Sequence, residues 1–314
     1  MSLGRSALAI GIAAALTGCA TSGARESLSA EDAPVLVDLR VRDNPTSPYR
    51  AVDSFTVPDS HIIGDGMMPY EGIGWENGLV GYRLYLDGRL VSDIFGKQRP
   101  DPALGKIEEY GSYHVLAPWG MDVLKVGPSL GLGGLGVMRA GQPTQFGTVP
   151  ELTATIGKSG GTEGAFVIDA AGIDLGAGVT GSYSAAYEIG SASPLTRVHV
   201  KASTGFPLAS GIVMHDGAEF LQSGETSGAW RYIATWGANQ SENKDGLGMA
   251  LFYRADQGSY GGLANATHFV AFKGARFDYA FLAAWERDPS RISSRAAFEA
   301  MLKDELQTLE GMKK

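Results

Sequence analysis

Short runs of alternating apolar and polar residues, separated by turn residues, recur along most of this 314-residue chain. Period-two alternation of this kind is typical of half-buried β-strands. The clearest case is a pair of runs, Leu79–Leu86 and Arg89–Phe95, on either side of the turn dipeptide Asp87-Gly88. The spacing of the runs predicts an all-β sandwich of large sheets. The other predicted strands are Gly164–Asp169, Ser182–Ile189, Arg197–Ser203, Trp230–Trp236, Leu247–Tyr253, Thr267–Phe272 and Tyr279–Trp285.

Only one segment has the apolar spacing of a helix. Between Ser294 and Leu309 the apolar side chains recur every three or four residues, which predicts an amphipathic C-terminal helix packed against the sandwich. The polar face of this helix mixes both charges, so a membrane or partner role is the less favoured interpretation. The apolar stripe consists of Phe298, Met301, Leu302, Leu306 and Leu309.

The N-terminal residues have the order of features that an export signal requires. A basic start precedes an apolar run from Ala7 to Leu16, and small residues then lead to a cysteine. The sequence Leu16-Thr17-Gly18-Cys19 resembles a bacterial lipobox, in which the cysteine is acylated and becomes the new N-terminus. The apolar run is shorter than the ~20 residues that a membrane-spanning helix needs. We therefore predict a lipoprotein signal peptide, with a plain signal peptide as the alternative.

The sequence predicts three parts. Residues 1–18 form the signal peptide, and residues 19–51, which are small, polar and dotted with proline, form a flexible tether from the lipidated Cys19. Residues 52–314 form a single β-sandwich domain, because no repeat is found and no linker follows residue 60. Ala20 after the cysteine resembles outer-membrane sorting. We therefore expect an exported protein, anchored by lipid to the outer membrane and facing the periplasm.

Charge and compartment argue against several function classes. The net charge is −8, and no basic stripe with interleaved aromatic residues offers a surface for nucleic acid. A protein outside the cytoplasm lies away from the ATP and nicotinamide pools, so no nucleotide or other cofactor is predicted. An anionic ligand would need a local cationic pocket in a molecule whose overall field repels it. Cys19 is the single cysteine, so no disulfide contributes to stability.

One glycine-rich segment matches the spacing of a dinucleotide-binding motif. The fingerprint in Gly131-Leu-Gly133-Gly134-Leu-Gly136 requires a strand before it and a helix that begins on it. The residues after it, 138–143, include glycine and proline and cannot begin such a helix. A glycine-rich strand with a sharp bend is therefore the predicted structure.

The histidines show none of the spacings of a metal site, so no metal is predicted. His199 alternates within a predicted strand and is interpreted as structural. His114 and His215 lie near turn residues at the ends of predicted strands, where sites are usually built. No Gly-x-Ser-x-Gly elbow accompanies them, which argues against a serine hydrolase.

The stretch from Tyr70 to Gly136 concentrates aromatic residues, cations, carboxylates and a histidine between glycines. Alternation places Arg83 and Tyr85 on the strand face opposite Tyr82. This mixture suits a sugar acid, because aromatic rings stack on the C–H faces of a pyranose. An arginine also holds a planar carboxylate with two parallel hydrogen bonds.

Five segments of this stretch resemble, in order, the bacterial domain-of-unknown-function 4861 family. They are Gly74-Trp75-Glu76-Asn77, Gly81-Tyr82-Arg83-Leu84-Tyr85, Asp93-Ile94-Phe95-Gly96-Lys97, Tyr113-His114 and Trp119-Gly120-Met121-Asp122-Val123-Leu124-Lys125-Val126-Gly127. A weaker match continues to His215 and to Tyr279–Trp285. This chain has Glu76-Asn77-Gly78 where many members carry an aspartate.

The resemblance implies an exported protein of polysaccharide degradation with a galactose-mutarotase-like β-supersandwich, a fold shared by many sugar-acid lyases. Members occur with machinery for uronate-rich glycans, and a related type is thought to dehydrate the terminal uronic acid of ulvan-like oligosaccharides. The resemblance therefore implies a carbon–oxygen lyase that removes water from the non-reducing-end uronic acid of an anionic oligosaccharide.

Dehydration removes H5 of the uronic acid and expels the 4-hydroxyl, which requires that the carboxylate charge be neutralised first. We assign that task to Arg83, as a bidentate fork, and to Lys125, as a point charge. His114 is the predicted base, and either Tyr113 or His215 protonates the departing hydroxyl. The other predicted substrate contacts are Trp75 and Trp119 as a stacking platform, Asn77 as a hydrogen-bonding group, Asp122 as the partner of Lys125 or His114, and Tyr85.

Two functions of other classes stay open from the sequence. A glycoside hydrolase needs two carboxylates ~5–10 Å apart across the scissile bond, and Glu76 with either Asp122 or Asp93 would supply them. A non-catalytic surface glycan-binding lipoprotein would use the same aromatic residues and the same arginine, and would turn nothing over.

Overall fold

The computed structural model describes residues 28–224 and 228–312, together with Met1. Cys19, the predicted signal peptide and the first part of the predicted tether lie outside the described residues. Within the described part, no helix combines the length and the hydropathy that crossing a membrane demands.

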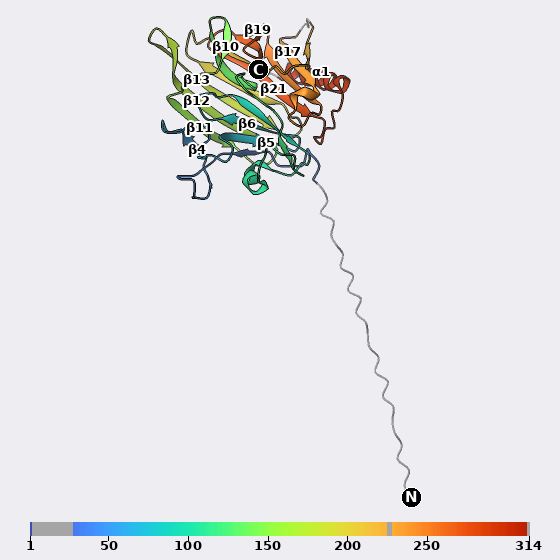
Figure 1. Cartoon of the computed structure of the whole chain (residues 1–314). Helices are drawn as coiled ribbons and strands as arrows, with labels where there is room; N and C mark the ends of the chain where they lie inside the picture. Colours follow the sequence, from blue (N-terminus) through green and yellow to red (C-terminus); the bar gives the residue numbers. More distant parts are fainter. Residues whose placement is uncertain (2–27, 225–227, 313–314) are drawn as a thin grey trace.

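Two layers of antiparallel sheet face each other and form a sandwich (Figure 1). One layer is a nine-stranded sheet, and the other consists of two five-stranded sheets that are linked where Ser92 bridges Gly131. Side chains from all three sheets meet in one hydrophobic core. The predicted all-β sandwich of large sheets is therefore confirmed.

The order of the strands across each sheet differs from their order along the chain. The nine-stranded sheet contains, from one edge to the other, β16 (Glu219–Gln222), β17 (Trp230–Gly237), β18 (Leu247–Arg254), β21 (Arg276–Trp285), β14 (Thr196–Ala202), β13 (Val179–Gly190), β12 (Glu163–Gly176), β11 (Glu151–Lys158) and β4 (Ser54–Thr56). The first five-stranded sheet contains β1 (Leu36–Asp38), β5 (Gly72–Glu76), β6 (Val80–Tyr85), β7 (Ser92–Lys97) and β8 (Gly120–Asp122). The second contains β10 (Gln142–Thr144), β9 (Leu132–Arg139), β15 (Leu208–Val213), β20 (Thr267–Phe272) and β19 (Gly258–Ala264). The short elements are β2 (Arg40–Val41), β3 (Arg50–Ala51) and the 3-10 helices η1 (Leu104–Tyr110) and η2 (Ala238–Gln240).

Aromatic rings occupy the centre of the core between β5, β6 and the nine-stranded sheet. The ring of Trp75 is fully buried, with its centroid 4.9 Å from that of Phe166 and 5.5 Å from that of Tyr82. The hydroxyl of Tyr82 donates a hydrogen bond to the Pro194 carbonyl and accepts one from the Ala283 N–H. These bonds cross the sandwich, so they fix β6 relative to the opposite layer.

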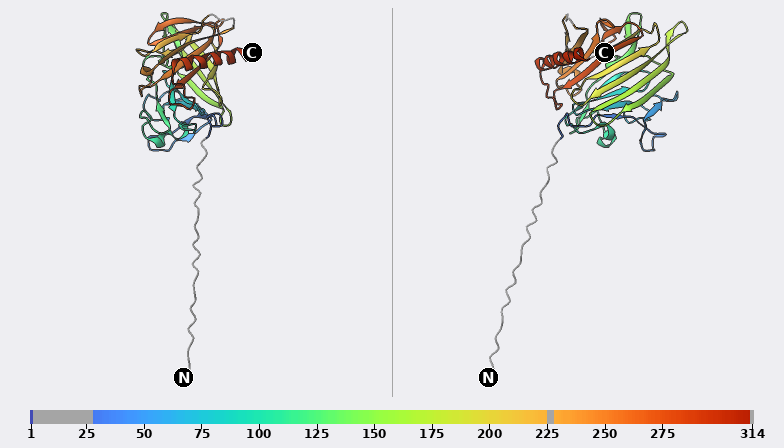
Figure 2. Two further views of the ribbon diagram at one scale, coloured as in Figure 1. Left: turned by 90° about the vertical axis from the view of Figure 1, so that its right-hand side faces the viewer. Right: turned by 180° about the vertical axis from the view of Figure 1, so that it is seen from behind.

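The predicted C-terminal helix is present as α1 (Arg295–Gly311). Ser294 caps it, because its hydroxyl accepts a hydrogen bond from the Ala297 N–H in the first turn. The apolar stripe packs on the outer face of β17, β18 and β21, where Phe298 and Leu302 are fully buried. Figure 2 shows the helix on this side, beside the long strands β12 to β14, whose outer face it leaves uncovered.

The folded domain begins before the predicted boundary at residue 52. Val35, Val37, Leu39 and Val41 alternate inward and are buried in the core, and β1 pairs with β5. The predicted tether is therefore wrong over its second half. The period-two alternation of these four residues turns each side chain into the core, and Val37 and Val41 lie in β1 and β2.

The glycine-rich segment forms strand β9, as predicted, and no helix begins on it. Gly133 has a φ of +76°, a conformation that glycine adopts without a steric penalty. A Cβ at this position would lie 2.2 Å from the ring of Phe281. The glycines thus let β9 approach β21 closely, and they serve packing rather than phosphate binding.

Candidate functional site

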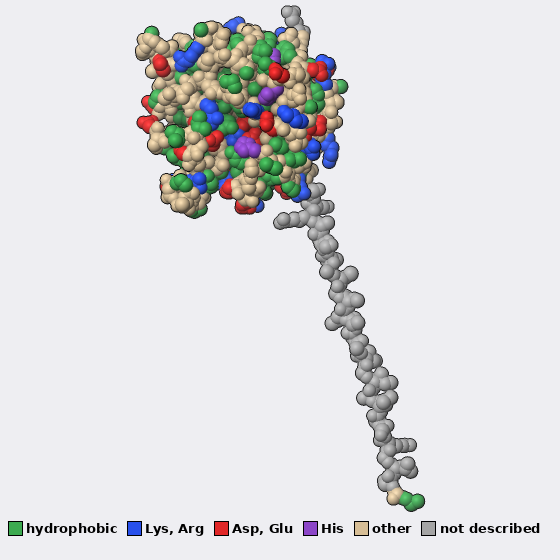
Figure 3. All heavy atoms as spheres, in the orientation of Figure 1, with side chains coloured by type: hydrophobic (Ala, Val, Ile, Leu, Met, Phe, Trp, Pro, Cys, Tyr) green, Lys and Arg blue, Asp and Glu red, His purple; other side chains and the backbone are tan. Residues whose placement is uncertain are grey.

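A pocket of about 400 Å³ opens on the outer face of β6 and β7, which is the face of the sheet opposite Tyr82 and the core. Acidic, basic and histidine side chains gather on the face of the molecule that Figure 3 shows. Four predicted site residues line the pocket: Tyr85, His114, Asp122 and Lys125. The complete lining is Tyr85, Arg89, Asp93, His114, Asp122, Leu124, Lys125, Val126, Gly127 and Glu242.

The floor of the pocket is a buried charge cluster centred on Arg83. Its Nη2 donates hydrogen bonds to the carboxylates of Asp93, in the facing register position of β7, and of Asp122 at 2.8 Å. Its Nη1 donates to the Tyr70 carbonyl at 3.3 Å. Only 1% of Arg83 is exposed. The predicted role of Arg83 as the fork that binds a substrate carboxylate is therefore wrong, because its guanidinium is buried and already paired with Asp93 and Asp122.

Two carboxylates share this one guanidinium, and that arrangement changes their acidity. Burial, and after it the neighbouring Asp122 carboxylate, raise the pKa of Asp93 to about 6, although Arg83 acts in the opposite direction. The hydroxyl of Tyr85 donates a hydrogen bond to Asp93 at 3.1 Å. The ring of Tyr85 lies 4.2 Å from the guanidinium carbon of Arg83, a cation–π contact that places the ring against the floor.

His114 and Asp122 form an acid–base pair at the mouth of the pocket. The Nδ1 of His114 lies 3.4 Å from Oδ2 of Asp122, and 66% of the histidine side chain is exposed. Hydrogen bonding to Asp122 raises the pKa of His114 above its ordinary value of 6.5. Because Asp122 engages Nδ1, the ring presents Nε2 to a ligand, the geometry that orients a general base.

Two cations line the pocket, and they differ in how far they are neutralised. Arg89 is bound through Nε and Nη2 to Asp87, at 2.6–3.0 Å, and its guanidinium carbon lies 4.1 Å from the Tyr85 ring. Lys125 is exposed, and among the described residues its ammonium group has no hydrogen-bond or ion-pair partner. Lys125 is therefore the cation most available to an anionic ligand.

The backbone of Lys125 is held by two segments that are distant in sequence. The Nε2 of His215 is 3.0 Å from the Lys125 carbonyl, and Leu124 bridges Ser241. Burial lowers the pKa of His215, so its neutral form persists at neutral pH. His215 does not line the pocket. The predicted role of His215 as a proton donor to the substrate is wrong, because its Nε2 faces the Lys125 carbonyl and its Nδ1 is buried, so neither ring nitrogen is presented to a ligand.

The structure does not bring Trp75 and Asn77 to the pocket. Trp75 is buried in the core, and its indole Nε1 donates a hydrogen bond to Thr196 at 2.9 Å. The Nδ2 of Asn77 donates to the carbonyls of Gly190 and Ser193 at 2.8 Å, which ties the turn after β5 to the loop between β13 and β14. Its Oδ1 closes that turn by accepting from the N–H groups of Leu79 and Val80. Neither side chain is free to touch a ligand, so both predicted substrate contacts are wrong.

Tyr113 and Trp119 lie beside the pocket rather than in its lining. The Tyr113 ring centroid is 4.4 Å from that of His114 and 5.7 Å from the Arg83 guanidinium carbon. Burial raises the pKa of Tyr113, and its hydroxyl therefore stays protonated at neutral pH. Trp119 packs in a small cluster with Phe95 and is 7% exposed, so it offers no open stacking face.

Glu76 forms a fully buried ion pair with Lys97, at 2.6 Å between Oε2 and Nζ. The N–H groups of Ala103 and Leu104 also donate to this carboxylate, at 2.8–3.0 Å, and fix the start of η1. Glu76 is therefore a structural residue. It cannot act with Asp122 or Asp93 as one of two carboxylates on either side of a glycosidic bond.

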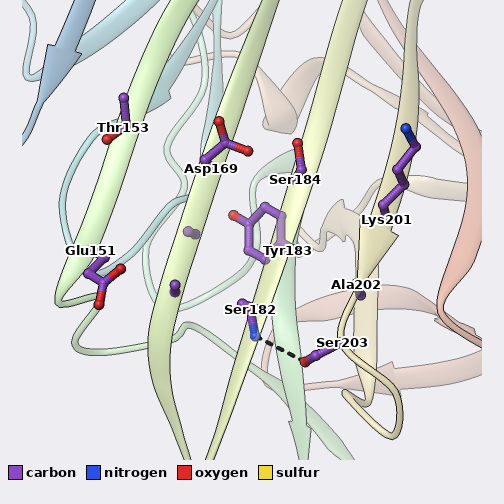
Figure 4. A pocket seen from close by; sticks show the side chains of 11 residues that line it. Glu151, Thr153, Asp169, Ser182, Tyr183, Ser184, Lys201, Ala202 and Ser203 are labelled. Carbon is purple, nitrogen blue, oxygen red and sulfur yellow. Dashed lines mark hydrogen bonds between the residues drawn. The ribbon is translucent and has the colours of Figure 1, made fainter.

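A second and larger hollow, of about 530 Å³, lies on the outer face of β11 to β14 (Figure 4). Thr153, Asp169, Ser184 and Lys201 stand in register across these four strands. Among the described residues that line it there is no histidine, and its two carboxylate residues, Glu151 and Asp169, are exposed. The hollow lacks the paired acid and base of the first pocket. No group of three or more potential metal ligands occurs within the described ranges either.

Sequence reasoning missed Arg89 and Glu242 as lining residues. Arg89 stands two residues after Asp87 in the loop between β6 and β7. The predicted two-residue turn would have paired it with Leu86 on the core face, but the observed loop is longer and brings Arg89 to the Tyr85 ring. Glu242 reaches the pocket because its N–H donates to the Val123 carbonyl at 2.9 Å. That contact joins segments more than a hundred residues apart, and no local pattern indicates it.

A family model described as a domain of unknown function (DUF4861) matches residues 25–312. A comparison with curated proteins gives no match. The matched range includes both layers of the sandwich and every residue of the pocket. The chain therefore belongs to the DUF4861 family.

Proposed function

We propose that this protein is a carbohydrate-active lyase that dehydrates the non-reducing-end uronic acid of anionic oligosaccharides. The observation that carries the proposal is the His114–Asp122 pair in one pocket with the unpaired ammonium of Lys125. A base and a free cation are the two groups that abstraction of a proton next to a carboxylate requires. The predicted signal peptide, residues 1–18, is consistent with a location outside the cytoplasm, where such glycans are met.

The first requirement is to neutralise the substrate carboxylate. H5 is a poor acid while that group is ionised, because proton removal adds a second negative charge to the same conjugated system. Lys125 supplies the free positive charge, and the Nη1 of Arg89 has no partner among the described residues. Groups that are already oriented toward the developing charge lower the barrier without reorganising.

Proton transfers complete the elimination. The Nε2 of His114 takes H5, the C5–H electron pair becomes the C4=C5 double bond, and the C4–O bond breaks. Tyr113 gives its hydroxyl proton to the departing oxygen, which leaves as water. Proton transfer from the His114 imidazolium, directly or through solvent, then restores Tyr113. Asp122 stabilises the imidazolium during the reaction through the contact at Nδ1.

The geometry supports the alternative classes less well. A hydrolase mechanism loses Glu76 to the pair with Lys97, and Asp93 and Asp122 both bind the same Arg83 nitrogen instead of flanking a bond. A purely binding protein has no need of an oriented histidine. Incubation with a panel of uronate-ended oligosaccharides should shorten their mass by one water and give absorbance from the new double bond. Release of reducing ends without absorbance would select the hydrolase, and binding without either change would select the glycan-binding protein.

Lys125→Ala is expected to lower kcat/KM for uronate-ended substrates by about tenfold to a hundredfold, since a hydrogen bond to a charged group is worth about 1.5–3 kcal/mol. The matched control is Lys201→Ala, which removes an exposed lysine from the second hollow. Steady-state kinetics with the absorbance assay compares the two. Equal rates in both variants would contradict the assignment of Lys125.

On the acid side of its pH profile, kcat/KM is expected to rise with pH through an apparent pKa above 6.5. The base must be neutral, and Asp122 raises the pKa of His114 above that value, so the rate rises with pH through the raised pKa. Asp122→Asn removes the negative partner and should move this rise to lower pH. Asp278→Asn, at the surface pair with His199, should leave it in place. A rise that stays unmoved in Asp122→Asn would rule out His114 as the titrating base.

A further inference from the structure

We propose that the pocket continues into an apolar subsite, formed by Tyr110, Val115 and Leu116, that binds the neutral sugar unit following the reacting uronic acid. This inference rests on the proposed function. It adds that the preferred substrate is an oligosaccharide whose second residue is uncharged and presents a C–H face.

Three large apolar side chains are exposed on the segment that carries His114. Tyr110 is 39% exposed, Val115 64% and Leu116 37%. Val115 and Leu116 directly follow His114, which lines the pocket, so the backbone places them next to the pocket mouth. Exposed apolar residues that cluster beside a polar site are more often part of a binding surface than scattered single ones.

Tyr110 is held as a platform rather than left loose. Its ring stacks on Trp119, with centroids 5.6 Å apart and an interplanar angle of 25°. Trp119 is backed in turn by Phe95, at 6.3 Å, and by the cluster beneath it. A ring fixed in this way loses little conformational freedom on binding, which favours stacking on a pyranose.

An unpartnered donor lies beneath the Tyr110 ring. The indole Nε1 of Trp119, in a side chain more than nine-tenths buried, has no hydrogen-bond partner among the described residues. A buried N–H left without an acceptor costs about 1–3 kcal/mol. Because this atom is itself buried, a ligand oxygen reaches it only if the Tyr110–Trp119 stack shifts when the sugar binds, and a purely apolar partner would leave it unsatisfied.

The charge of this segment selects the class of sugar. Residues 110–118 contain no Asp, Glu, Lys or Arg, and His114 belongs to the reacting pocket. A sulfated or carboxylated sugar would bring its charge onto an apolar surface without a counterion, which is unfavourable. The subsite therefore fits a neutral pyranose, and the acidic function of the substrate lies in the first pocket.

The test compares Tyr110→Ala and Leu116→Ala in the full chain, with a uronate-ended trisaccharide and the methyl glycoside of the same uronate. Stacking worth about 0.5–1.5 kcal/mol predicts that KM for the trisaccharide rises about threefold to tenfold in Tyr110→Ala, with kcat unchanged. The inhibition constant of the methyl glycoside against the trisaccharide should stay the same. Tyr110→Phe should retain the wild-type KM, and Ile63→Ala, which truncates an exposed side chain on another loop, should have no effect.

Equal changes for the long and the short ligand, or no change for either, would overturn the subsite. If the wild-type protein binds the trisaccharide without converting it, the proposed dehydration fails and calorimetric affinities replace KM in the same comparison. The subsite then stands only if Tyr110→Ala weakens binding of the trisaccharide alone. Absence of trisaccharide binding by the wild-type protein would overturn it.

Discussion

Replacing His114 with alanine is expected to lower kcat for uronate dehydration by about a hundredfold to ten-thousandfold, the range that a positioned general base contributes. The side chain is 66% exposed, so its removal should leave the fold intact. The measurement is the absorbance of the unsaturated product, with a thermal melt to confirm that the variant is folded.

The chain offers a matched control for this substitution. His199 also pairs with an aspartate, Asp278, at 2.8 Å, and its imidazole is 49% exposed. It lies on the outer face of the nine-stranded sheet, away from the pocket. His199→Ala should therefore keep the wild-type rate. A rate in His114→Ala equal to that in His199→Ala would remove the base from the mechanism.

Arg83→Met is expected to destabilise the fold by about 3–5 kcal/mol at pH 8, because it leaves two buried carboxylates without their shared cation. Chemical denaturation followed by tryptophan fluorescence measures the loss. The combined variant Arg83→Met with Asp93→Asn should recover part of it, because only one buried charge then remains. A loss below about 1 kcal/mol would show that the cluster is solvated.

The penalty in Arg83→Met should shrink as the pH falls. The folded-state pKa of Asp93 is about 6, above the 3.8 of an ordinary aspartate. The folded state therefore binds more protons than the unfolded state between these values, and stability falls as the pH rises through that window. Without Arg83 the pKa of Asp93 rises further, which strengthens the same trend. A penalty equal at pH 5 and pH 8 would contradict this account.

Alternation along β6 correctly predicted which of its side chains face the core and which face the opposite side of the sheet. Arg83 and Tyr85 were expected on the face opposite Tyr82, and the structure confirms this, with Tyr82 in the core and Tyr85 lining the pocket. Side-chain direction depends only on the backbone period, so the sequence was sufficient. The availability of the Arg83 charge was not predictable in the same way, since Asp122 arrives from another strand.

The errors at Trp75 and Asn77 come from reading residue type without register. In the β5–β6 ladder Trp75 pairs with Tyr82, so both rings point to the core. Asn77-Gly78 is a turn signal, and a hairpin there would have placed Trp75 on the same face as Val80 and Tyr82, although the observed register is shifted from that of a two-residue Asn-Gly turn. Residue type alone favoured a sugar platform, because the same aromatic ring serves a core and a binding site equally well.

Tertiary contacts account for what no local pattern contains. Glu242 and His215 reach the Lys125 segment across about a hundred residues of chain. In contrast, the early start of the domain was encoded locally, in the inward alternation from Val35 to Val41. Composition alone had suggested a tether there, and periodicity was the better guide.

Strand β6 separates the hydrophobic core from the candidate site, because its side chains alternate between the two. Tyr82 is hydrogen-bonded to Pro194 and Ala283 of the opposite layer, and the next residue, Arg83, holds the carboxylates at the floor of the pocket. A substitution that opens a cavity or adds bulk on the core side of β6 would therefore also displace the residues at the floor of the pocket. Variants with a repacked core near Tyr82, made to raise thermal stability, should therefore be screened for turnover as well as for melting temperature.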